Sequence, residues 1–479
     1  MPGSRRAAVL VVATLLAATL VPVLARPAAA FTASPLHVTW MAGYRAPGTP
    51  ARYDRVGVIE VGKASARNVL VLEPGTSAAA AYFVPLAEWI VARQPSWQVW
   101  AVQRRETLLD DESELDAFKE KKATPAELFD YYLGWLSNKS ITHHVQFVAS
   151  QSVTFAKQWG MKVAVEDLRR VITAAHRLGG KVVLGGHSLG GAVVTAYATW
   201  DFGGHPGADG LAGLVFIDGS SFGQPVSAGQ ARSELATLDA PTSSPWLTFG
   251  GITAPLAGIF SATGSAAALL DPNAPSLGQS SKLLPPDLVP PVPVTNQAEY
   301  GYALNVATSP PSLEAAQGHL GTGILSLTVD GHHTWDGSGA LTPISRFATM
   351  FSGYPMLGVD GSEWYFPQRL TDDTGAVDNG NPNPAQSVLG VDDTMGHHLP
   401  KRLLIYAFAA HLGGPAVLTA TRQLAAQSGI PSRNLTLVDR HTTYAHNDPA
   451  GAYPTNAFFA HLVPFLTKVA RAGERGTGT

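Results

Sequence analysis

Residues 181–200 read KVVLGGHSLGGAVVTAYATW and contain the strongest local pattern in the chain. The first five residues are largely apolar and β-branched and predict a short buried strand, and the small and apolar residues from position 191 onward predict a helix. Between them, Gly186, Ser188 and Gly190 form Gly-x-Ser-x-Gly, which is the pattern of a nucleophile elbow. Glycine on both sides of the serine permits a sharp turn, and the amides at the start of the helix point toward the serine side chain. The pattern therefore indicates Ser188 as the candidate nucleophile.

The first thirty residues have the pattern of a secretory signal peptide. Arg5 and Arg6 form a basic start, residues 7–24 are apolar, and Ala28 and Ala30 supply the small residues of an Ala-x-Ala cleavage site. We expect signal peptide 1–30 to be removed, the mature chain to begin at Phe31, and the protein to be secreted. A membrane anchor is the alternative, and export by the Sec or the twin-arginine route is left open.

The composition is that of a soluble exported enzyme without a nucleic-acid partner. The chain has 479 residues, a net charge of −3 and 14% charged residues, and no basic stripe that would bind phosphates. Cysteine is absent, which excludes disulfides and thiolate metal sites. After the signal peptide no segment is long and apolar enough to span a bilayer, so we expect no stable membrane span in the mature protein.

Strand and helix patterns alternate in two parts of the chain, residues 31–219 and 401–479, which predicts a parallel α/β core in two pieces. The intervening residues 220–400 are rich in proline, glycine and serine and also carry many aromatic residues. We predict that they form a folded cap or lid inserted in the core, and a long, partly disordered insertion is the alternative. The predicted core strands are residues 53–62, 68–73, 97–103, 181–185, 211–217, 401–408 and 434–438. The predicted core helices are residues 78–93, 124–136, 154–178, 416–428 and 455–472.

Two further groups of polar residues are predicted to have no part in catalysis or metal binding. Residues 104–120 are charged and predict a surface excursion, in which Glu106, Asp110 and Asp111 are solvated rather than paired for catalysis. Histidines are neighbours in three places, at residues 143–144, 332–333 and 397–398. Adjacent residues do not share a face of a helix or strand, and no His-Glu-x-x-His is present. We therefore predict no metal and no other cofactor.

Partners for Ser188 are expected in loops at the carboxyl ends of other strands, because parallel strands bring those loops to one edge of a sheet. His446 follows the last predicted strand and is the candidate general base, with His441 in the same loop as its competitor. A carboxylate must also hold the imidazole in one tautomer and stabilise its charged form.

With these motifs in this order the chain resembles the α/β-hydrolase superfamily, and within it secreted bacterial serine esterases and lipases. The resemblance covers residues 53–219 and 401–470 and implies a mostly parallel, doubly wound sheet that is flanked by helices and carries a large inserted cap. It also implies the chain order Ser, acid, His. The catalytic triad it implies is therefore Ser188, Asp218 and His446.

The acid is the point at which the sequence departs from the commoner family pattern. Asp218 directly follows a predicted strand and matches the family's acid after the sixth core strand. The position after the seventh strand, residues 409–413, offers no carboxylate. Asp392 or Asp393, late in the predicted cap, is the fallback.

The resemblance also bears on the base and on the oxyanion hole. An acidic residue just after the histidine is usual in the family, and Asp448 occupies that place behind His446. The family's oxyanion hole uses two backbone amides, which the resemblance assigns to Leu189, the residue after the nucleophile, and to Thr76 in the turn at residues 74–76.

The activity that the resemblance implies is hydrolysis of a carboxylic ester through a covalent acyl-enzyme. An apolar, aromatic cap indicates a lipophilic group, so the expected partner is a small-molecule or lipid ester. Serine at the elbow argues against haloalkane dehalogenase and epoxide hydrolase chemistry, which use aspartate there. Acyl transfer, peptidase action and cofactor-free perhydrolysis are alternatives on the same triad. An alternative of another class is a catalytically incomplete hydrolase fold that serves as a binding module, which the missing acid after the seventh strand favours.

Overall fold

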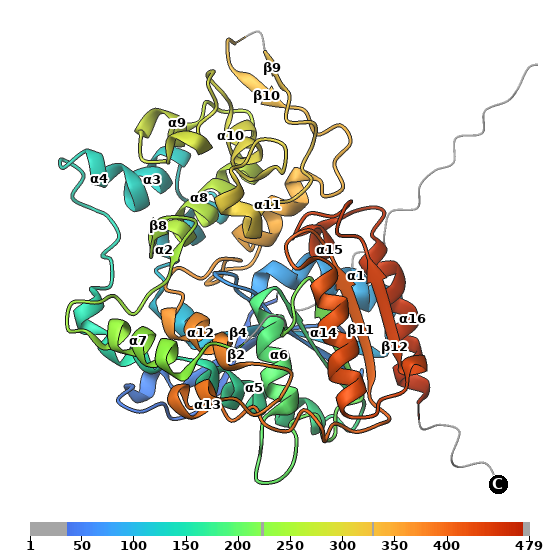
Figure 1. The fold of residues 1–479 in the computed structure, drawn as a ribbon. Helices are drawn as coiled ribbons and strands as arrows, with labels where there is room; N and C mark the ends of the chain where they lie inside the picture. The colour runs from blue at the N-terminus through green and yellow to red at the C-terminus, as the bar shows by residue number, and fades with distance from the viewer. Residues whose placement is uncertain (1–35, 222–224, 328–329, 473–479) are drawn as a thin grey trace, which may run out of the picture. The chain divides into compact units, whose positions relative to one another are not determined.

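The computed structural model of the protein describes residues 36–221, 225–327 and 330–472. The signal peptide predicted for residues 1–30 lies outside these described residues. A sheet runs through the molecule, with helices packed around it (Figure 1). It has eight strands in the order β1-β2-β4-β3-β5-β6-β11-β12. Its strands are β1 (Val38–Ala42), β2 (Arg55–Val61), β3 (Asn68–Glu73), β4 (Trp97–Gln103), β5 (Val182–His187), β6 (Gly213–Ile217), β11 (Leu404–Ala409) and β12 (Leu435–Asp439).

The sheet is mostly parallel. All strands from β4 across to β12 run in one direction, and β2 and β1 add two antiparallel pairings at one edge. β1 is not among the strands that the sequence predicts. Most of β2 is buried, because Ile59 and Val61 pack in one apolar core and Val56 and Val58 pack in a second. The predicted α/β class with a mostly parallel sheet is confirmed.

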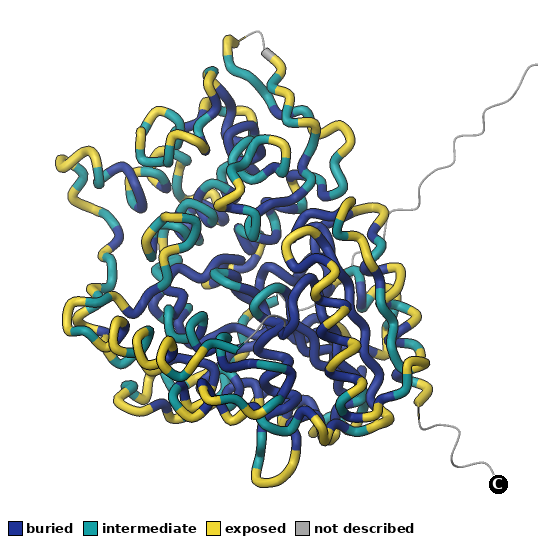
Figure 2. The backbone as a smooth tube through the Cα atoms, viewed as in Figure 1, coloured by how far each residue is buried: buried dark blue, intermediate teal, exposed yellow. Residues whose placement is uncertain are grey.

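Helices cover both faces of the sheet, as a doubly wound fold requires. They are α1 (Val84–Arg93), α5 (Met161–His176), α6 (Leu189–Thr199), α14 (Gly414–Gln427) and α16 (Ala457–Arg471). Because side chains alternate along a strand, Leu70 and Leu72 of β3 pack in one apolar core with α1 and α16. Val69 and Val71 of the same strand pack in a second core with α5, α6 and α14. The strands between the two edge strands β1 and β12 are buried almost throughout, whereas the edge strands are mostly half-buried or exposed (Figure 2).

The chain between β6 and β11 contains seven α-helices in its described residues, and they divide into two groups. They are α7 (Ala228–Asp239), α8 (Leu256–Leu270), α9 (Leu277–Ser281), α10 (Asn296–Leu304), α11 (Ile344–Ser352), α12 (Gln368–Asp373) and α13 (Pro384–Leu389). The helices α8 to α11 pack on one another and lie together in Figure 1. The helices α7, α12 and α13 instead contribute Ala231, Leu370 and Leu389 to the core beside α5 and α6. The domain limits at residues 219 and 400 remain predictions.

Residues 104–120 are not the surface excursion that their charges predict. Arg104, Arg105 and Glu106 have exposed fractions of 6%, 1% and 3%. Arg104 pairs with Glu73 of β3 at 2.8 Å, and Arg105 pairs with Asp167 of α5 at 2.7 Å. The prediction was wrong because the carboxylates that compensate these arginines lie elsewhere in the sequence.

Two predicted element boundaries also differ from the structure. The helix expected from residue 154 begins as α5 at Met161, because a separate 3₁₀ turn (Thr154–Gln158) precedes it and Gly160 is extended. The loop expected after residue 439 contains a short helix, α15 (Asp448–Gly451). Pro449 is the second residue of α15, and the first turn tolerates proline because its missing N–H would have no partner within the helix there.

Candidate active site

Ser188 lies in a strained turn between β5 and α6. Its φ is 57° and its ψ is −128°, a combination that residues other than glycine seldom adopt. A Cβ atom on Gly186 would lie 2.2 Å from the carbonyl oxygen of Gly190, and one on Gly190 would lie 2.3 Å from that of Glu73. The backbone N–H of Ser188 donates to the carbonyl of Ile217 at 3.0 Å, which ties the turn to β6. Only glycine therefore fits on either side of the serine.

Asp218 is fixed at the end of β6 by the backbone of β11 and of the turn that follows it. Its N–H donates to the carbonyl of Phe408 at 2.8 Å. Its Oδ1 accepts from the amides of Ala410 at 2.7 Å and Gly413 at 3.1 Å. The turn after β11, which contains no carboxylate of its own, thus supplies two amide donors to Asp218. The second oxygen, Oδ2, is left for another partner.

That partner is His446. Its Nδ1 lies 2.7 Å from Oδ2 of Asp218, and the two side chains are 1% and 0% exposed. Burial raises the pKa of Asp218, but the hydrogen bond and charge of His446, with the two amides, outweigh it and bring the pKa below its ordinary value. An ionised carboxylate only accepts, so Nδ1 is assigned the proton and Nε2 is the acceptor. Nε2 is buried and has no hydrogen-bond partner among the described residues. It can take a proton from a group that enters the site.

A second histidine, which the sequence pattern does not single out, lies against the first. The ring of His187 stacks on Tyr82 with centroids 5.2 Å apart and lies 4.3 Å from the ring of His446. Its Nε2 is 2.9 Å from the carbonyl oxygen of His446. Burial, and next the charge of His446, lower the pKa of His187 to about 3. His187 is therefore neutral at physiological pH and adds no positive charge beside the base.

The loop that carries His446 is held in place by Asp448. Oδ2 of Asp448 accepts from the amide of Ala445 at 2.7 Å and lies 2.6 Å from Nδ1 of His319. Oδ1 accepts from the hydroxyl of Thr342 at 2.7 Å and from the amide of His319 at 3.0 Å. Asp448 is fully buried, so this carboxylate is a structural link between the histidine loop and the segment ahead of α11.

The competing candidates lie away from this arrangement. Nδ1 of His441 is 2.6 Å from Oδ1 of Asp439, and both side chains are more than a third exposed. Asp393 is buried and bonds to the hydroxyl of Thr199 in α6. Asp392 lies next to Asp393 along the chain, and its backbone carbonyl accepts from the amide of Asp201. None of these side chains is in the hydrogen-bond network that holds His446.

The two predicted oxyanion donors, Leu189 and Thr76, belong to segments that border Ser188. Leu189 is the first residue of α6, so its amide belongs to the free N-terminus of that helix. Gly75 and Thr76 line the same pocket as Ser188 and His446. A Cβ atom on Gly75 would lie 2.7 Å from Cβ of Ser188, so the turn after β3 is in close contact with the serine.

An apolar pocket opens at Ser188. Its walls include residues of the turn after β3, of α3 (Pro125–Phe129) and its continuation, and of the helices α8 to α11. Leu128, Phe129, Phe260, Tyr300 and Phe351 are among the lining residues. The pocket can therefore hold an apolar chain with one end at the serine.

A strand, a sharp turn that carries serine and a helix within a mostly parallel sheet form the α/β-hydrolase arrangement. No protein-family model matches the chain. No curated protein matches it significantly.

Solved structures that resemble the chain include lipases and esterases. A candidate lipase from Sulfolobus solfataricus has a TM-score of 0.42 and 12% identity, and the match covers 91% of this chain and 93% of that one. A soluble variant of monoglyceride lipase from Saccharomyces cerevisiae has a TM-score of 0.38 and 10% identity, with 92% and 97% covered. A highly thermostable carboxyl esterase from Bacillus coagulans has a TM-score of 0.38 and 10% identity, with 91% and 100% covered.

Two further findings concern metals and membranes. Within residues 36–221, 225–327 and 330–472, no group of three or more His, Cys, Asp or Glu side chains is arranged to hold a metal ion. One of the neighbouring histidines, His144, stacks on Trp135 with ring centroids 4.1 Å apart, which accounts for it as a packing residue. In the same part of the chain, no helix combines the length and apolarity that crossing a membrane needs.

Proposed function

We propose that this protein is a serine hydrolase that cleaves a carboxylic ester through a covalent acyl-enzyme. One observation carries the proposal: Asp218 and His446 are joined at 2.7 Å, and the free Nε2 of that histidine shares a pocket with Ser188 in its strained turn. Nucleophile, base and orienting carboxylate are the three parts that such catalysis needs.

In the proposed reaction the hydroxyl oxygen of Ser188 attacks the ester carbonyl carbon while its proton passes to Nε2 of His446. The negative oxygen that forms on that carbon receives hydrogen bonds from the amides of Leu189 and Thr76. The ester C–O bond then breaks, the alcohol leaves with the proton from Nε2, and the acyl group stays on the serine. Water next gives a proton to Nε2 and attacks the acyl carbon. Release of the acid and return of that proton regenerate the free serine.

The proposed substrate is an ester with a lipophilic group, because the pocket beside Ser188 is lined by apolar and aromatic side chains such as Phe129 and Phe260. The proposed cap, residues 220–400, supplies part of that lining through α8 and α10. Burial of each methylene contributes about 0.8 kcal/mol. We therefore expect kcat/KM to rise by up to about fourfold per added methylene along a 4-nitrophenyl ester series until the pocket is filled.

The test of the proposed function is labelling of the purified protein with a fluorophosphonate, which needs an activated serine and no knowledge of the substrate. We expect one adduct, mapped by mass spectrometry to Ser188, and no adduct in Ser188→Ala or His446→Ala. Ser261→Ala is the matched control, because this serine lines the same pocket on α8 and has no proposed role. A folded protein that takes no label and hydrolyses no ester would favour the binding module instead.

Secretion is proposed on the signal-peptide pattern of residues 1–30 alone. The protein should accumulate in the medium of an expressing culture with Phe31 as its N-terminal residue. Retention of residues 1–30 on a membrane-bound protein would contradict the proposal and favour the anchor.

A further inference from the structure

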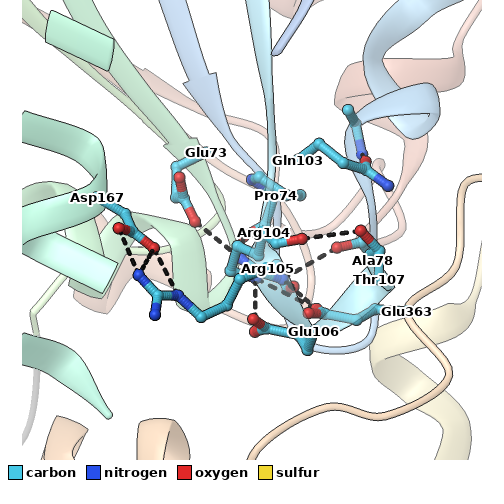
Figure 3. Close-up of polar contacts among 12 residues, drawn as sticks. Glu73, Pro74, Ala78, Gln103, Arg104, Arg105, Glu106, Thr107, Asp167 and Glu363 are labelled. Carbon is cyan, nitrogen blue, oxygen red and sulfur yellow. Dashed lines mark hydrogen bonds and ion pairs between the residues drawn. The ribbon is translucent and has the colours of Figure 1, made fainter. Parts of the chain in front are cut away.

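One buried arginine binds the whole turn that follows β3 (Figure 3). Arg104 comes directly after β4 and is 6% exposed. Its Nη1 donates to the carbonyl of Pro74 at 2.9 Å, and its Nη2 donates to the carbonyls of Gly75 at 2.8 Å and Ala78 at 3.0 Å. Nη1 also donates to Oε1 of Glu73 at 2.8 Å. A single guanidinium thus collects three carbonyl oxygens of one turn.

These contacts fix the direction in which the amides of the turn point. In a trans peptide the C=O and N–H bonds point in opposite directions, and neither peptide bond of Gly75 is cis. Because the carbonyls of Pro74 and Gly75 face Arg104, the N–H groups of Gly75 and Thr76 face away from it. Gly75 also lies in contact with Ser188, so the turn is held between the guanidinium and the serine.

The guanidinium is itself held from the opposite side. Oε2 of Glu363 accepts from Nη2 of Arg104 at 2.7 Å and from Nε at 3.2 Å. The amide of Glu363 donates to the carbonyl of Ser77 at 3.0 Å, so this residue binds both the arginine and the turn. Oε1 of Glu106 lies 3.6 Å from Nε. Burial, and next repulsion from Glu363, raise the pKa of Glu106.

We propose that Arg104 is a positioning residue for ester hydrolysis, which fixes the turn at residues 74–78 so that the Thr76 amide meets the developing oxyanion at Ser188. The inference rests on the proposed function. A positive charge on the carbonyl of Gly75 also polarises the peptide group it shares with Thr76, which makes that N–H a stronger donor. Arginine suits this role because its planar fork offers five donors in a rigid arrangement, whereas lysine offers three donors on one nitrogen.

The neighbouring arginine provides a matched control. Arg105 is also buried, and its ion-pair partners are Asp167 at 2.7 Å and Asp54 at 3.0 Å. Its Nη2 donates to the carbonyl of Tyr44 at 2.8 Å. These partners belong to the segment between β1 and β2 and to α5, and none of them is in the turn after β3. Arg105→Lys therefore disturbs a buried ion pair of the same kind without touching the proposed oxyanion donor.

The experiment compares Arg104→Lys and Arg105→Lys in three measurements: kcat and KM for 4-nitrophenyl butyrate, the affinity for an alkyl trifluoromethyl ketone, and the melting temperature. The ketone forms a tetrahedral adduct with an activated serine and so reports binding of the oxyanion. For Arg104→Lys we expect kcat to fall at least about tenfold, with about 10²–10³-fold as the limit set by loss of one donor. Ketone affinity should fall by the same factor while KM stays near its original value. Arg105→Lys should lower the melting temperature and leave kcat and ketone affinity unchanged.

Several results would overturn the inference. Unchanged kcat and ketone affinity in Arg104→Lys, with Ser188→Ala inactive in the same assay, would refute it and leave the proposed function standing. Equal losses in both lysine variants would make Arg104 merely structural. An original protein that neither hydrolyses esters nor takes a fluorophosphonate would refute the proposed function and the inference with it. If Arg104→Lys does not fold, the variant Glu363→Gln is used in its place. This variant loosens the guanidinium of Arg104, so kcat and ketone affinity should fall together. Unchanged kcat and ketone affinity in Glu363→Gln would also refute the inference.

Discussion

The substitution Gly75→Ala tests the contact between the turn after β3 and the nucleophile. The added Cβ would lie 2.7 Å from Cβ of Ser188, 3.4 Å from its Oγ and 3.2 Å from the carbonyl oxygen of His187. Carbon atoms pack at about 3.5–4.0 Å, so the turn and the serine must move apart by about 1 Å. A misplacement of about 1 Å costs about 10²-fold in rate, or about 2.7 kcal/mol in the activation barrier.

The assay is kcat for 4-nitrophenyl butyrate, together with the second-order rate of fluorophosphonate labelling. Both should fall about 10²-fold in Gly75→Ala, while KM changes little because the apolar pocket is intact. Gly337→Ala is the matched control, because a Cβ atom there meets nothing within 4 Å and its φ is not in the left-handed region. This control should keep full activity. A Gly75→Ala variant with the original kcat would refute the view that the turn after β3 packs on the nucleophile during catalysis.

Three more predictions follow from the buried groups of the site. Asp218→Asn should lower kcat about 10⁴-fold with little effect on folding, because the two amides that bind Oδ1 force the new NH₂ toward His446 and reverse the tautomer of this histidine. A pH–rate profile measures the loss of kcat, and a loss below tenfold would contradict the prediction. Burial lowers the pKa of His187 to about 3 in the native chain. Below a pH of about 6.5 this histidine is therefore protonated in the unfolded chain but stays neutral in the native chain. As the pH is lowered from about 6.5 to about 3, the free energy of unfolding should therefore fall by up to about 1.4 kcal/mol per pH unit. In denaturant titrations at several pH values, His187→Asn should remove this contribution to the pH dependence. Asp448→Asn should cost about 1–3 kcal/mol in the same titrations, because the new NH₂ faces donors such as the amide of His319; an unchanged midpoint would contradict it.

The elbow could be predicted because its requirement is local. A Cβ atom on Gly186 would strike the backbone of Gly190, which lies in the same five-residue pattern. A Cβ atom on Gly190 would strike Glu73 of β3, but the place of this glycine is fixed by the same pattern. The association of Asp218 with His446 spans 228 residues, and it could be expected from the order of parallel strands, which gathers their carboxyl ends at one edge. Their catalytic roles, and those of Leu189 and Thr76, stay predictions.

The surroundings of Arg104 could not be predicted from the sequence. Its partners Glu73 and Glu363 are 31 and 259 residues away, so no periodicity links them to it. A run of charges is most often solvated, and only the folded chain brings compensating carboxylates to a buried arginine. The same holds for α7, α12 and α13, whose apolar residues join a core that lies elsewhere in the sequence.

The histidine loop is tied to the segment that helps to line the pocket. The side chain of Asn447 donates to the carbonyls of Ala315 and Gln317 at 3.1 Å and 3.0 Å, and Asp448 binds His319 at 2.6 Å. Ala315 is itself a lining residue. Any displacement of this segment must break those bonds or carry the base with it. Entry of an acyl chain into the pocket and the position of His446 are thus thermodynamically coupled. A ligand that favours one arrangement of the segment that carries Ala315 also favours one position of His446.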